Sequence, residues 1–265
     1  MQIIFHGTRG SSSLSIHDCL RYGGNTTSIE VLMANFRIIF DAGTGFQNIN
    51  FNHSNLNNVL LLSHFHHDHI QGLASNTSIF EDNYSLTITS DLCDFDQLKK
   101  ILFSYFSPPY FPINLFNRNF NLNIVSFRET VETLASDIKL KSICLNHPGG
   151  ACGYSIETQN EKVVILLDNE FCSSQIKQLM DFCEDSDVVV WDGMYTDAEL
   201  CLKKGWGHSS IEQALEFSKY TDAKKIIIAH HSTFRTDTEL NLLASLYEKS
   251  KLFFAYDGMV LDISA

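Results

Sequence analysis

The stretch His64-Phe65-His66-His67-Asp68-His69 places four histidines and one carboxylate within six positions, directly after an apolar run of strand character. Imidazole and carboxylate together suit zinc, manganese or iron. In an extended loop, side chains two residues apart point the same way, so His64 and His66 can bind one ion. Asp68 and His69 follow where a helix can begin, and they turn toward a second ion. The alternative is a solvated histidine-rich loop without metal.

The composition is that of an ordinary soluble globular protein. Of the 265 residues, 44% are hydrophobic and 19% are charged. No apolar run reaches roughly eighteen residues, the length that a transmembrane helix needs. We expect one compact hydrolase domain over residues 1–265. The N-terminus enters a strand pattern without a charged and then apolar leader, so we predict a cytoplasmic protein without a membrane partner.

The charge balance is acidic, because 19 Lys and Arg stand against 31 Asp and Glu, a net charge of −12. An acidic surface does not attract a polyanion such as tRNA or DNA, so a nucleic-acid partner is disfavoured. A small anionic substrate is compatible, because two divalent ions make their own site positive. Seven cysteines without a C-x-x-C pair indicate scattered reduced thiols rather than disulfides or a zinc knuckle.

Short apolar runs between glycine turns predict strands along the whole chain, and strands with helices in both halves fit a two-sheet sandwich with helices outside. The predicted strands are 2–5, 28–33, 36–40, 59–63, 86–89, 123–127, 138–144, 153–157, 162–167, 188–191 and 226–229, with a final strand pair within 252–263. The predicted helices are 94–103, 173–183, 210–220 and 237–250. Residues 48–58 are predicted to form an Asn-rich surface connection.

Three further candidate ligands each follow a predicted strand. His147 precedes the rigid turn Pro148-Gly149-Gly150, where an imidazole can be presented. Asp168 ends an apolar strand, where a carboxylate must be paired or metal-bound. His230 ends another apolar strand, and its neighbour His231 is the less favoured alternative. A hydrogen-bonded core residue is the commoner interpretation of each alone, but three in this order after the histidine stretch favour metal ligands.

This combination resembles the metal-binding signature of the metallo-β-lactamase superfamily, His-x-His-x-Asp-His, with His67 in a variable position. The resemblance implies an α/β (α+β) fold, the four-layer αββα sandwich with a two-metal site along one edge, between its two sheets. It assigns the first metal to His64, His66 and His147, and the second metal to Asp68, His69 and His230, with Asp168 bridging them. Zinc is the expected metal, and manganese or iron are the alternatives.

The C-terminal third resembles the ribonuclease Z-like and cyclic-phosphate phosphodiesterase branch of that superfamily. The matching segments are 189–195, 206–210 and 255–257, together with the glycine loops 7–11 and 21–26. The resemblance implies that His208 is a proton donor held by Asp192, and that Asp68 also serves catalysis. The alternatives are a helix-capping surface imidazole for His208 and a purely structural role for Asp192.

The predicted reaction is hydrolysis of a small phosphodiester, most favourably a 3′,5′-cyclic nucleotide, by a hydroxide held between two metals with His208 as general acid. Two features disfavour tRNA 3′ processing: the acidic surface, and the 21 positions between His147 and Asp168, too few for the arm that the tRNA enzymes carry. The alternatives are an RNA 3′-processing endonuclease of the ribonuclease Z type, a thioester or lactam hydrolase, and a non-catalytic sensing protein.

Two features have more than one interpretation. Residues 104–116 of the Pro- and aromatic-rich segment 103–116 are predicted to form neither helix nor central strand. The segment can cover the metal site, stack a base, contact a subunit or pack on its own aromatic cluster. Arg9 can contact phosphate or form a surface salt bridge. A homodimer is expected, because members of this branch are commonly homodimers.

Overall fold

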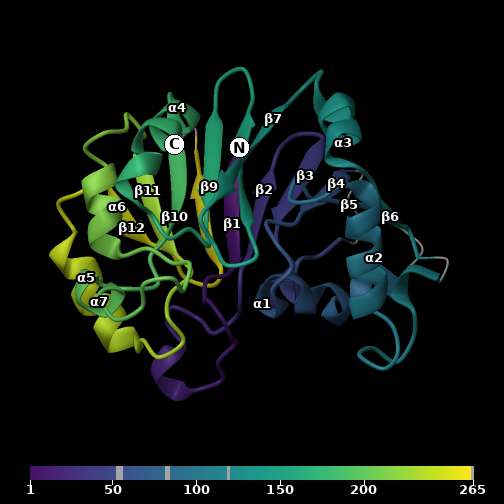
Figure 1. Cartoon of the computed structure of the whole chain (residues 1–265), viewed down its shortest axis with the longest axis horizontal. Coiled ribbons are helices and arrows are strands. Elements are labelled where there is room, and N and C mark those ends of the chain that lie inside the picture. The colour runs from purple at the N-terminus through teal and green to yellow at the C-terminus, as the bar shows by residue number, and fades with distance from the viewer. Residues whose placement is uncertain (52–55, 81–83, 118–119, 264–265) are drawn as a thin grey trace.

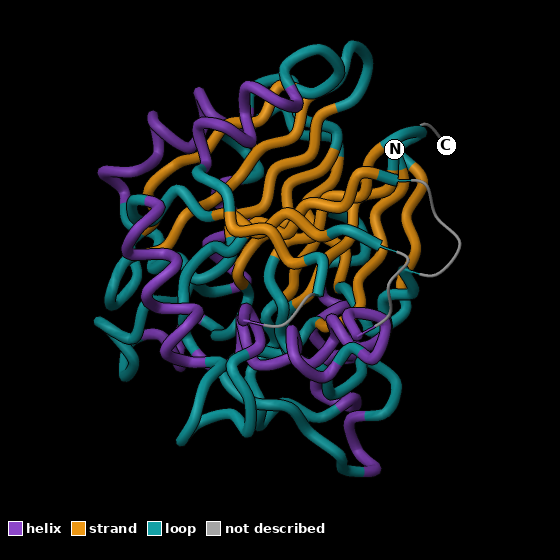
Figure 2. Tube along the Cα trace, turned by 90° about the vertical axis from the view of Figure 1, so that its right-hand side faces the viewer, coloured by secondary structure: helices purple, strands orange, loops and turns teal. Residues whose placement is uncertain are grey.

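The computed structural model of the chain describes residues 1–51, 56–80, 84–117 and 120–263. Two β-sheets face each other, and helices cover the outer face of each (Figure 1). In the perpendicular view, the strands cross the middle of the molecule and many of the loops gather at one end (Figure 2). The structure is thus the predicted four-layer αββα sandwich.

The first sheet has seven strands in the order β13-β1-β2-β3-β4-β5-β6. Its strands are antiparallel from β13 to β3 and parallel from β3 to β6. Their bounds are β1 Gln2–Gly7, β2 Ser28–Leu32, β3 Phe36–Phe40, β4 Asn57–Leu61, β5 Leu86–Thr89, β6 Leu122–Ile124 and β13 Met259–Asp262. Residues 52–55 of the predicted connection 48–58 lie outside the described residues.

The second sheet has six strands in the order β12-β11-β10-β9-β8-β7. Its strands are parallel from β12 to β9 and antiparallel from β9 to β7. Their bounds are β7 Lys139–Leu145, β8 Ala151–Glu157, β9 Lys162–Leu166, β10 Val188–Asp192, β11 Lys225–Ala229 and β12 Leu252–Phe254.

Helices pack outside each sheet, and none among the described residues is long and apolar enough to cross a membrane. The α-helices are α1 His67–Ile70, α2 Phe95–Tyr105, α3 Phe127–Leu134, α4 Ile176–Cys183, α5 Asp197–Leu200, α6 Ile211–Phe217 and α7 Asp237–Leu246. All four predicted helices are present, with α4 extended at its start by a 3₁₀ turn, Ser173–Gln175. The side chains of Asp94, Ser210 and Thr236 cap α2, α6 and α7 at their N-termini.

Two predictions at the ends of elements are wrong. The strand predicted over 123–127 ends at Ile124, because the Ser126 side chain accepts a hydrogen bond from Glu129 N and caps α3, which the sequence analysis missed. The predicted final strand pair is no hairpin, since β12 pairs with β11 whereas β13 pairs with β1. The turn between β12 and β13 therefore carries the chain from one sheet to the other.

The inner core lies between the sheets and positions the site. It contains apolar side chains from facing strands, such as Ile3, Val31, Ile156, Val190 and Ile227. Two outer cores lie between each sheet and its helices. The inner parallel strands β9, β10 and β11 are buried on both faces, which explains their continuous apolar runs. Their carboxyl ends lie at one edge of the sandwich, where ligands bind in open parallel sheets.

Candidate metal centre

The predicted metal ligands meet at this edge, where strands of both sheets end. The loop after β4 and the short helix α1 provide four of them, His64, His66, Asp68 and His69. The other three follow β7, β9 and β11, and they are His147, Asp168 and His230. The structure therefore brings together all the residues that the sequence singled out for metal binding, from positions up to 166 residues apart in the chain (230 − 64).

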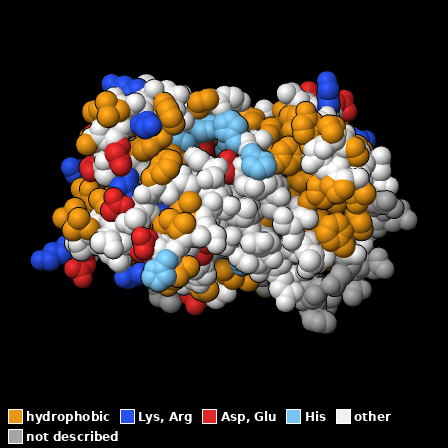
Figure 3. Space-filling model, turned by 90° about the horizontal axis from the view of Figure 1, so that it is seen from below, with side chains coloured by type: hydrophobic (Ala, Val, Ile, Leu, Met, Phe, Trp, Pro, Cys, Tyr) orange, Lys and Arg blue, Asp and Glu red, His pale blue; other side chains and the backbone are white. Residues whose placement is uncertain are grey.

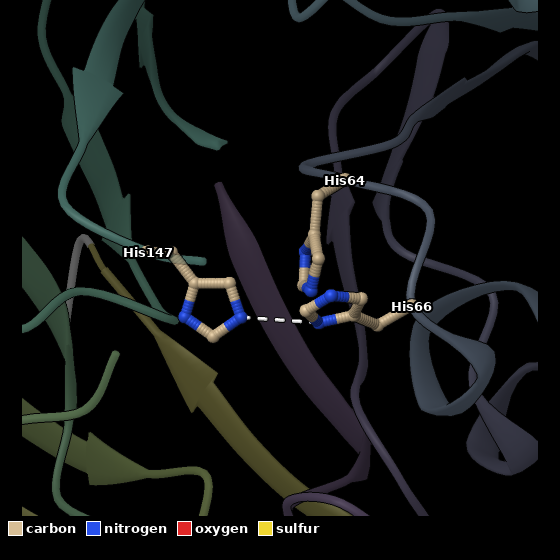
Figure 4. Close-up of side chains that lie close together, drawn as sticks. All are labelled: His64, His66 and His147. Carbon is tan, nitrogen blue, oxygen red and sulfur yellow. Dashed lines mark hydrogen bonds between the residues drawn. The ribbon is translucent and has the colours of Figure 1, made fainter. Parts of the chain in front are cut away.

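His64, His66 and His147 form the first group of candidate ligands (Figure 4). The Nδ1 of His66 lies 3.1 Å from the Nε2 of His147, and the His64 ring centroid lies 4.4 Å and 4.8 Å from the other two. One potential ligand atom of each residue lies within 4.8 Å of the others. Three imidazoles with converging nitrogens are a typical zinc-binding set.

Asp168 lies between this group and a second one formed by Asp68, His69 and His230. Its Oδ2 is 3.2 Å from His69 Nε2, and its Oδ1 is 3.4 Å from His230 Nε2. The same Oδ1 is 3.6 Å from His147 Nε2, which belongs to the first group. One carboxylate therefore faces both groups, as a bridging ligand must.

Buried atoms without partners show that this pocket fits a cation. Within the described part of the chain, the Nε2 atoms of His64, His69 and His230 and the Oδ2 of Asp168 are buried without a hydrogen-bond partner. Burying such polar atoms unsatisfied is costly, and native proteins rarely do so. All four atoms point into the same small volume and carry lone pairs, so divalent metal ions satisfy them.

The opposite ring nitrogen of each of these histidines is held by the protein. His69 Nδ1 hydrogen-bonds Asp41 Oδ2 at 2.8 Å, and His147 Nδ1 hydrogen-bonds the Gly207 carbonyl at 2.8 Å. His64 Nδ1 contacts the Ser63 hydroxyl and His230 Nδ1 contacts the Thr27 hydroxyl, at 2.9 Å and 3.0 Å. Such partners fix each ring so that Nε2 faces the pocket, an arrangement typical of metal-binding histidines.

Backbone strain is concentrated at the same place. Five non-glycine residues in the described ranges have a left-handed φ, and four of them, Ser11, Asp41, Asp168 and His230, lie at this site with φ of 58–60°. Such conformations are costly and tend to occur at functional sites. Ser11 uses its position to donate its backbone N–H to Asp68 Oδ2 at 2.8 Å. The sequence analysis missed Ser11, Thr27, Asp41 and Ser63 as supporting residues.

The charges of the site favour the ligand-competent forms of Asp168, His64 and His230. For His69, burial by itself lowers the pKa, but the carboxylates of Asp168, Asp68 and Asp41 outweigh it and raise that pKa well above its usual value. Burial by itself raises the pKa of Asp168, but the imidazoles of His230 and His69 outweigh it and hold that pKa well below its usual range. Burial lowers the pKa of His64 well below its usual value and also lowers that of His230, so both imidazoles are neutral at pH 7. Ionised carboxylates and neutral imidazoles are the forms that bind metal.

His208 and Asp192 form a buried pair beside this pocket. His208 Nδ1 lies 2.8 Å from Asp192 Oδ2, and the His208 ring stacks on that of His230 at 5.1 Å. Burial alone would lower the pKa of His208, but the charge and hydrogen bond of Asp192 outweigh it and raise that pKa to about 9. His208 is buried and Ser210 caps α6, so the alternative of a helix-capping surface imidazole is wrong.

Three other residues named from the sequence lie away from the metal centre. The ring of His231 packs on Phe254, and its Nε2 hydrogen-bonds the Ala255 carbonyl at 2.9 Å, which leaves His230 as the candidate ligand. Arg9 is buried, and its guanidinium donates to backbone carbonyls, including that of Gly23 at 2.8 Å. Neither predicted role of Arg9, phosphate contact or surface salt bridge, is correct.

Asp257 was placed in the last strand by the sequence analysis, but it lies in the turn before β13. Its Oδ1 accepts from the backbone N–H of Thr8 at 3.0 Å, and its Oδ2 accepts from that of Asn25 at 2.9 Å. Asp257 thus joins the two N-terminal glycine loops. A side chain at Gly23 would collide with it, since an added Cβ lies 2.1 Å from the Asp257 Cγ.

Most of the aromatic segment 103–116 packs on itself. The buried ring of Phe106 contacts Phe111 and Phe116, and the rings of Phe103 and Phe116 stack at 5.3 Å. Among the roles that the sequence left open for this segment, these ring contacts support packing on its own aromatic cluster. Ser104 and Tyr105 are in helix α2, so the prediction of no helix is wrong for these two residues.

A comparison with protein families identifies the group to which the chain is related. Residues 36–231 match the family model described as the β-lactamase superfamily domain. The chain belongs to the metallo-β-lactamase superfamily. The predicted superfamily and sandwich are therefore confirmed.

Curated relatives and solved structures agree with this membership. The ribonuclease Z of Macrococcus caseolyticus (strain JCSC5402) is 31% identical over 108 residues, 40% of this chain and 34% of the relative. The chain thus spans about a third or less of the length of the curated relatives it matches. The metallo-β-lactamase fold protein YhfI of Bacillus subtilis has a TM-score of 0.74 at 17% identity, covering 98% of each chain. The short form of human tRNase Z has a TM-score of 0.69 at 18% identity, covering 99% of each chain.

Proposed function

We propose that the chain is a metal-dependent phosphodiesterase that hydrolyses a small phosphodiester, preferably a 3′,5′-cyclic nucleotide. The observation that carries the proposal is the buried His208–Asp192 pair, 2.8 Å apart, beside the candidate metal centre. The alkoxide that leaves a phosphodiester is a poor leaving group and needs a proton, whereas β-lactam hydrolysis does not need this pair in this place. General acid catalysis of this kind is typically worth about 10²–10⁴-fold.

The proposed ligands follow the two groups of side chains. His64, His66 and His147 would hold one divalent ion, Asp68, His69 and His230 would hold the other, and Asp168 faces both groups. Zinc is favoured by the imidazole-rich set, while manganese and iron accept the same residues. When bound, two such ions supply Lewis-acid polarisation of the phosphate and activation of the attacking water.

The residues of the chain perform the proton chemistry. Asp192 holds His208 through Nδ1, so the other ring nitrogen, Nε2, is the one that donates to the leaving oxygen. With a pKa of about 9, His208 is protonated at neutral pH and ready to donate. Asp192 is fully buried, and its Oδ1 also accepts the backbone N–H of Met194 at 3.1 Å, so its position is fixed. His208 and Asp192, with Asp68 fixed by Ser11, are the proposed catalytic residues.

The size of the substrate is inferred from the chain between His147 and Asp168. This interval is filled by strand β8, a turn and strand β9, so it holds no arm for binding tRNA. The net charge of −12 also disfavours a polyanion. RNA 3′ processing is the second candidate function, because the matched curated relatives are ribonucleases Z. The homodimer and the cytoplasmic location stay predictions.

A substrate panel tests the proposal. Protein loaded with zinc or manganese is offered 3′,5′- and 2′,3′-cyclic nucleotides, bis-p-nitrophenyl phosphate, a pre-tRNA and a chromogenic β-lactam, with His208→Ala in parallel. We expect turnover of a 3′,5′-cyclic nucleotide that is largely lost in His208→Ala. Preferential cleavage of the pre-tRNA would support the second candidate. Cleavage of the lactam alone, unaffected in His208→Ala, would disprove the phosphodiesterase proposal.

A further inference from the structure

A cavity of about 820 Å³ lies along the exposed side of α2, and one of its lining residues, Tyr105, contacts His67 in the metal-binding loop. Its walls include Gln97, Lys100, Ile101 and Ser104 from α2, with two tyrosines, Tyr105 and Tyr110, at its C-terminal end. The volume is within the range of pockets that bind small organic ligands, roughly 300–1,000 Å³. None of its lining residues is a candidate metal ligand.

A direct contact connects this cavity to the metal-binding loop. The Tyr105 hydroxyl hydrogen-bonds His67 Nδ1, and the two ring centroids are 5.8 Å apart. His67 stands between the candidate ligands His66 and Asp68, and its Cα is therefore only about 3.8 Å from theirs. The hydrogen bond between Tyr105 and His67 thus joins one wall of the cavity to the loop that carries the candidate ligands.

The contact with Tyr105 gives a role to His67, which occupies the variable position of the metal-binding pattern. Its side chain is exposed rather than directed into the buried ligand cluster. Partial burial raises the pKa of Tyr105, so the phenol stays protonated and donates to His67 Nδ1. The contact holds the His67 ring at the boundary between metal centre and cavity.

The lining of the cavity indicates the chemistry of its occupant. Tyr110 is 80% exposed, and Tyr105 is partly buried. The phenylalanines of the same segment instead pack against one another. Seen from below, hydrophobic side chains lie beside the hollow in which imidazoles gather, on the side of α2 (Figure 3). Asp94 and Asp96 at the other end repel a second phosphate but suit amino and hydroxyl donors.

We infer that this cavity binds the base of a nucleotide substrate, with Tyr105 and Tyr110 as the residues on which the base stacks. The inference rests on the proposed phosphodiesterase function. It assigns a binding site to the base, the part of the substrate that the metal centre does not contact. Aromatic side chains bind bases by stacking, which is tolerant of base identity. Gln97 and Asp96 provide the hydrogen-bonding groups that distinguish one base from another.

Kinetics with matched substrates test the inference. The metal-loaded full chain is offered 2′-deoxyadenosine 3′,5′-cyclic phosphate and the corresponding deoxyribose 3′,5′-cyclic phosphate without a base. Since stacking on an aromatic ring is worth a factor of about ten or more, Tyr110→Ala should raise the KM for the nucleotide about tenfold. The preference of the enzyme for the nucleotide over the base-free compound should fall by the same factor.

Two further variants separate the contributions. Tyr105→Ala should reduce the preference for the nucleotide over the base-free compound. Tyr105→Phe should retain that preference, because it keeps the ring and loses only the hydrogen bond to His67. Tyr220→Ala is the matched control, because Tyr220 is an equally simple exposed phenol, 45% exposed, just after α6 on the second sheet. An equal rise in KM for both compounds in Tyr110→Ala, or the same change in Tyr220→Ala, would overturn the inference.

Binding of free nucleosides separates this inference from the proposed function. Equilibrium dialysis of adenosine, guanosine, cytidine and uridine against the full chain, with and without metal, requires no turnover. Binding that is weakened about tenfold in Tyr110→Ala supports the cavity assignment, even if no phosphodiester is hydrolysed and the proposed function fails. Absence of nucleoside binding, together with equal turnover of nucleotide and base-free compound, overturns the inference while the phosphodiesterase stands.

Discussion

Asp192 binds His208 and the backbone of Asp168 through the same carboxylate oxygen. Oδ2 accepts from His208 Nδ1 at 2.8 Å and from the backbone N–H of Asp168 at 3.1 Å. The residue that orients the proposed proton donor is thus joined to the residue proposed to lie between the metals. The proposed proton donor and the candidate metal centre are therefore held in fixed relation by one buried side chain.

This relation makes the activity sensitive to the leaving group. We expect His208→Ala to lower kcat for a cyclic nucleotide by about 10²–10⁴-fold, because the leaving alkoxide is then not protonated. For bis-p-nitrophenyl phosphate the loss should be less than about tenfold, since a nitrophenolate leaves without a proton. Asp192→Asn should also lower kcat more for the cyclic nucleotide than for bis-p-nitrophenyl phosphate, but by a smaller factor. Asparagine keeps the shape of the side chain and loses its negative charge.

The measurement is the ratio of kcat values for the two substrates in each variant. His17→Ala is the control, since the side chain of His17 is 94% exposed in the loop before β2. Equal losses on both substrates in His208→Ala would show that His208 supports the structure of the site and does not donate a proton.

The N-terminal glycine loop should control occupancy of the second metal position. A Cβ added to Gly10 would lie 2.4 Å from Cδ2 and 2.5 Å from Nε2 of His230, so the imidazole has to move. We expect Gly10→Ala to lower the bound metal from two ions toward one per chain, measured by elemental analysis after dialysis. Ser12→Ala, at an exposed neighbouring position, is the control. Two retained ions in Gly10→Ala would contradict the expectation.

The positions of the candidate ligands could be predicted because each follows a strand that the sequence makes recognisable. An apolar run ends, and a residue such as Asp168 or His230 stands where water and partners are scarce. Parallel strands then bring their carboxyl ends to one edge, and residues far apart in the chain meet. The same reasoning favoured His230 over its neighbour His231, and the structure separates them, because His231 bonds the Ala255 carbonyl whereas His230 Nε2 lies 3.4 Å from Asp168 Oδ1.

The supporting residues could not be predicted, because their roles exist only in three dimensions. Asp41 and His69 are 28 positions apart, and Thr27 and His230 are 203 apart. A serine, a threonine or an aspartate in a glycine turn has no local feature that indicates such a partner. Helix α3 was missed for a different reason, since the apolar residues Ile124, Val125 and Phe127 suggested a strand and the capping by Ser126 was overlooked.

Metal binding should stabilise the fold. The buried Nε2 atoms of His64, His69 and His230 gain their partners only with a cation, and a ligand at about 100 times its Kd adds about 2.7 kcal/mol. For a chain of this size, that corresponds to a rise in Tm of about 5–10 °C. Differential scanning fluorimetry with zinc and with a chelator measures it.

Asp168→Ala provides the comparison, because it removes the carboxylate that faces both groups of ligands. Its Tm should respond to zinc much less than that of the unchanged chain. An equal zinc-dependent rise in both proteins would show that the ion binds elsewhere on the surface.

Glu30 should make stability depend on acid pH. Glu30 is buried, and it lies 2.6 Å from His6 Nε2 and accepts from Arg37 Nε at 2.5 Å. Burial by itself raises the pKa of Glu30, but the hydrogen bond with His6 and the charge of Arg37 outweigh it and lower that pKa. A carboxylate with a lowered folded-state pKa stabilises the fold above its unfolded pKa and loses this contribution as pH falls through the folded value.

Glu30→Gln should therefore cost most at pH 7, by about 3 kcal/mol of unfolding free energy, because Arg37 is left buried beside a neutral amide. The difference from the unchanged chain should shrink below about pH 4, where Glu30 itself becomes protonated. Urea unfolding at a series of pH values measures it. Glu132→Gln is the control, since Glu132 pairs with Arg128 on the surface of α3, where such pairs contribute little. A cost for Glu30→Gln that stays constant with pH would mean that packing, and not charge, accounts for its effect.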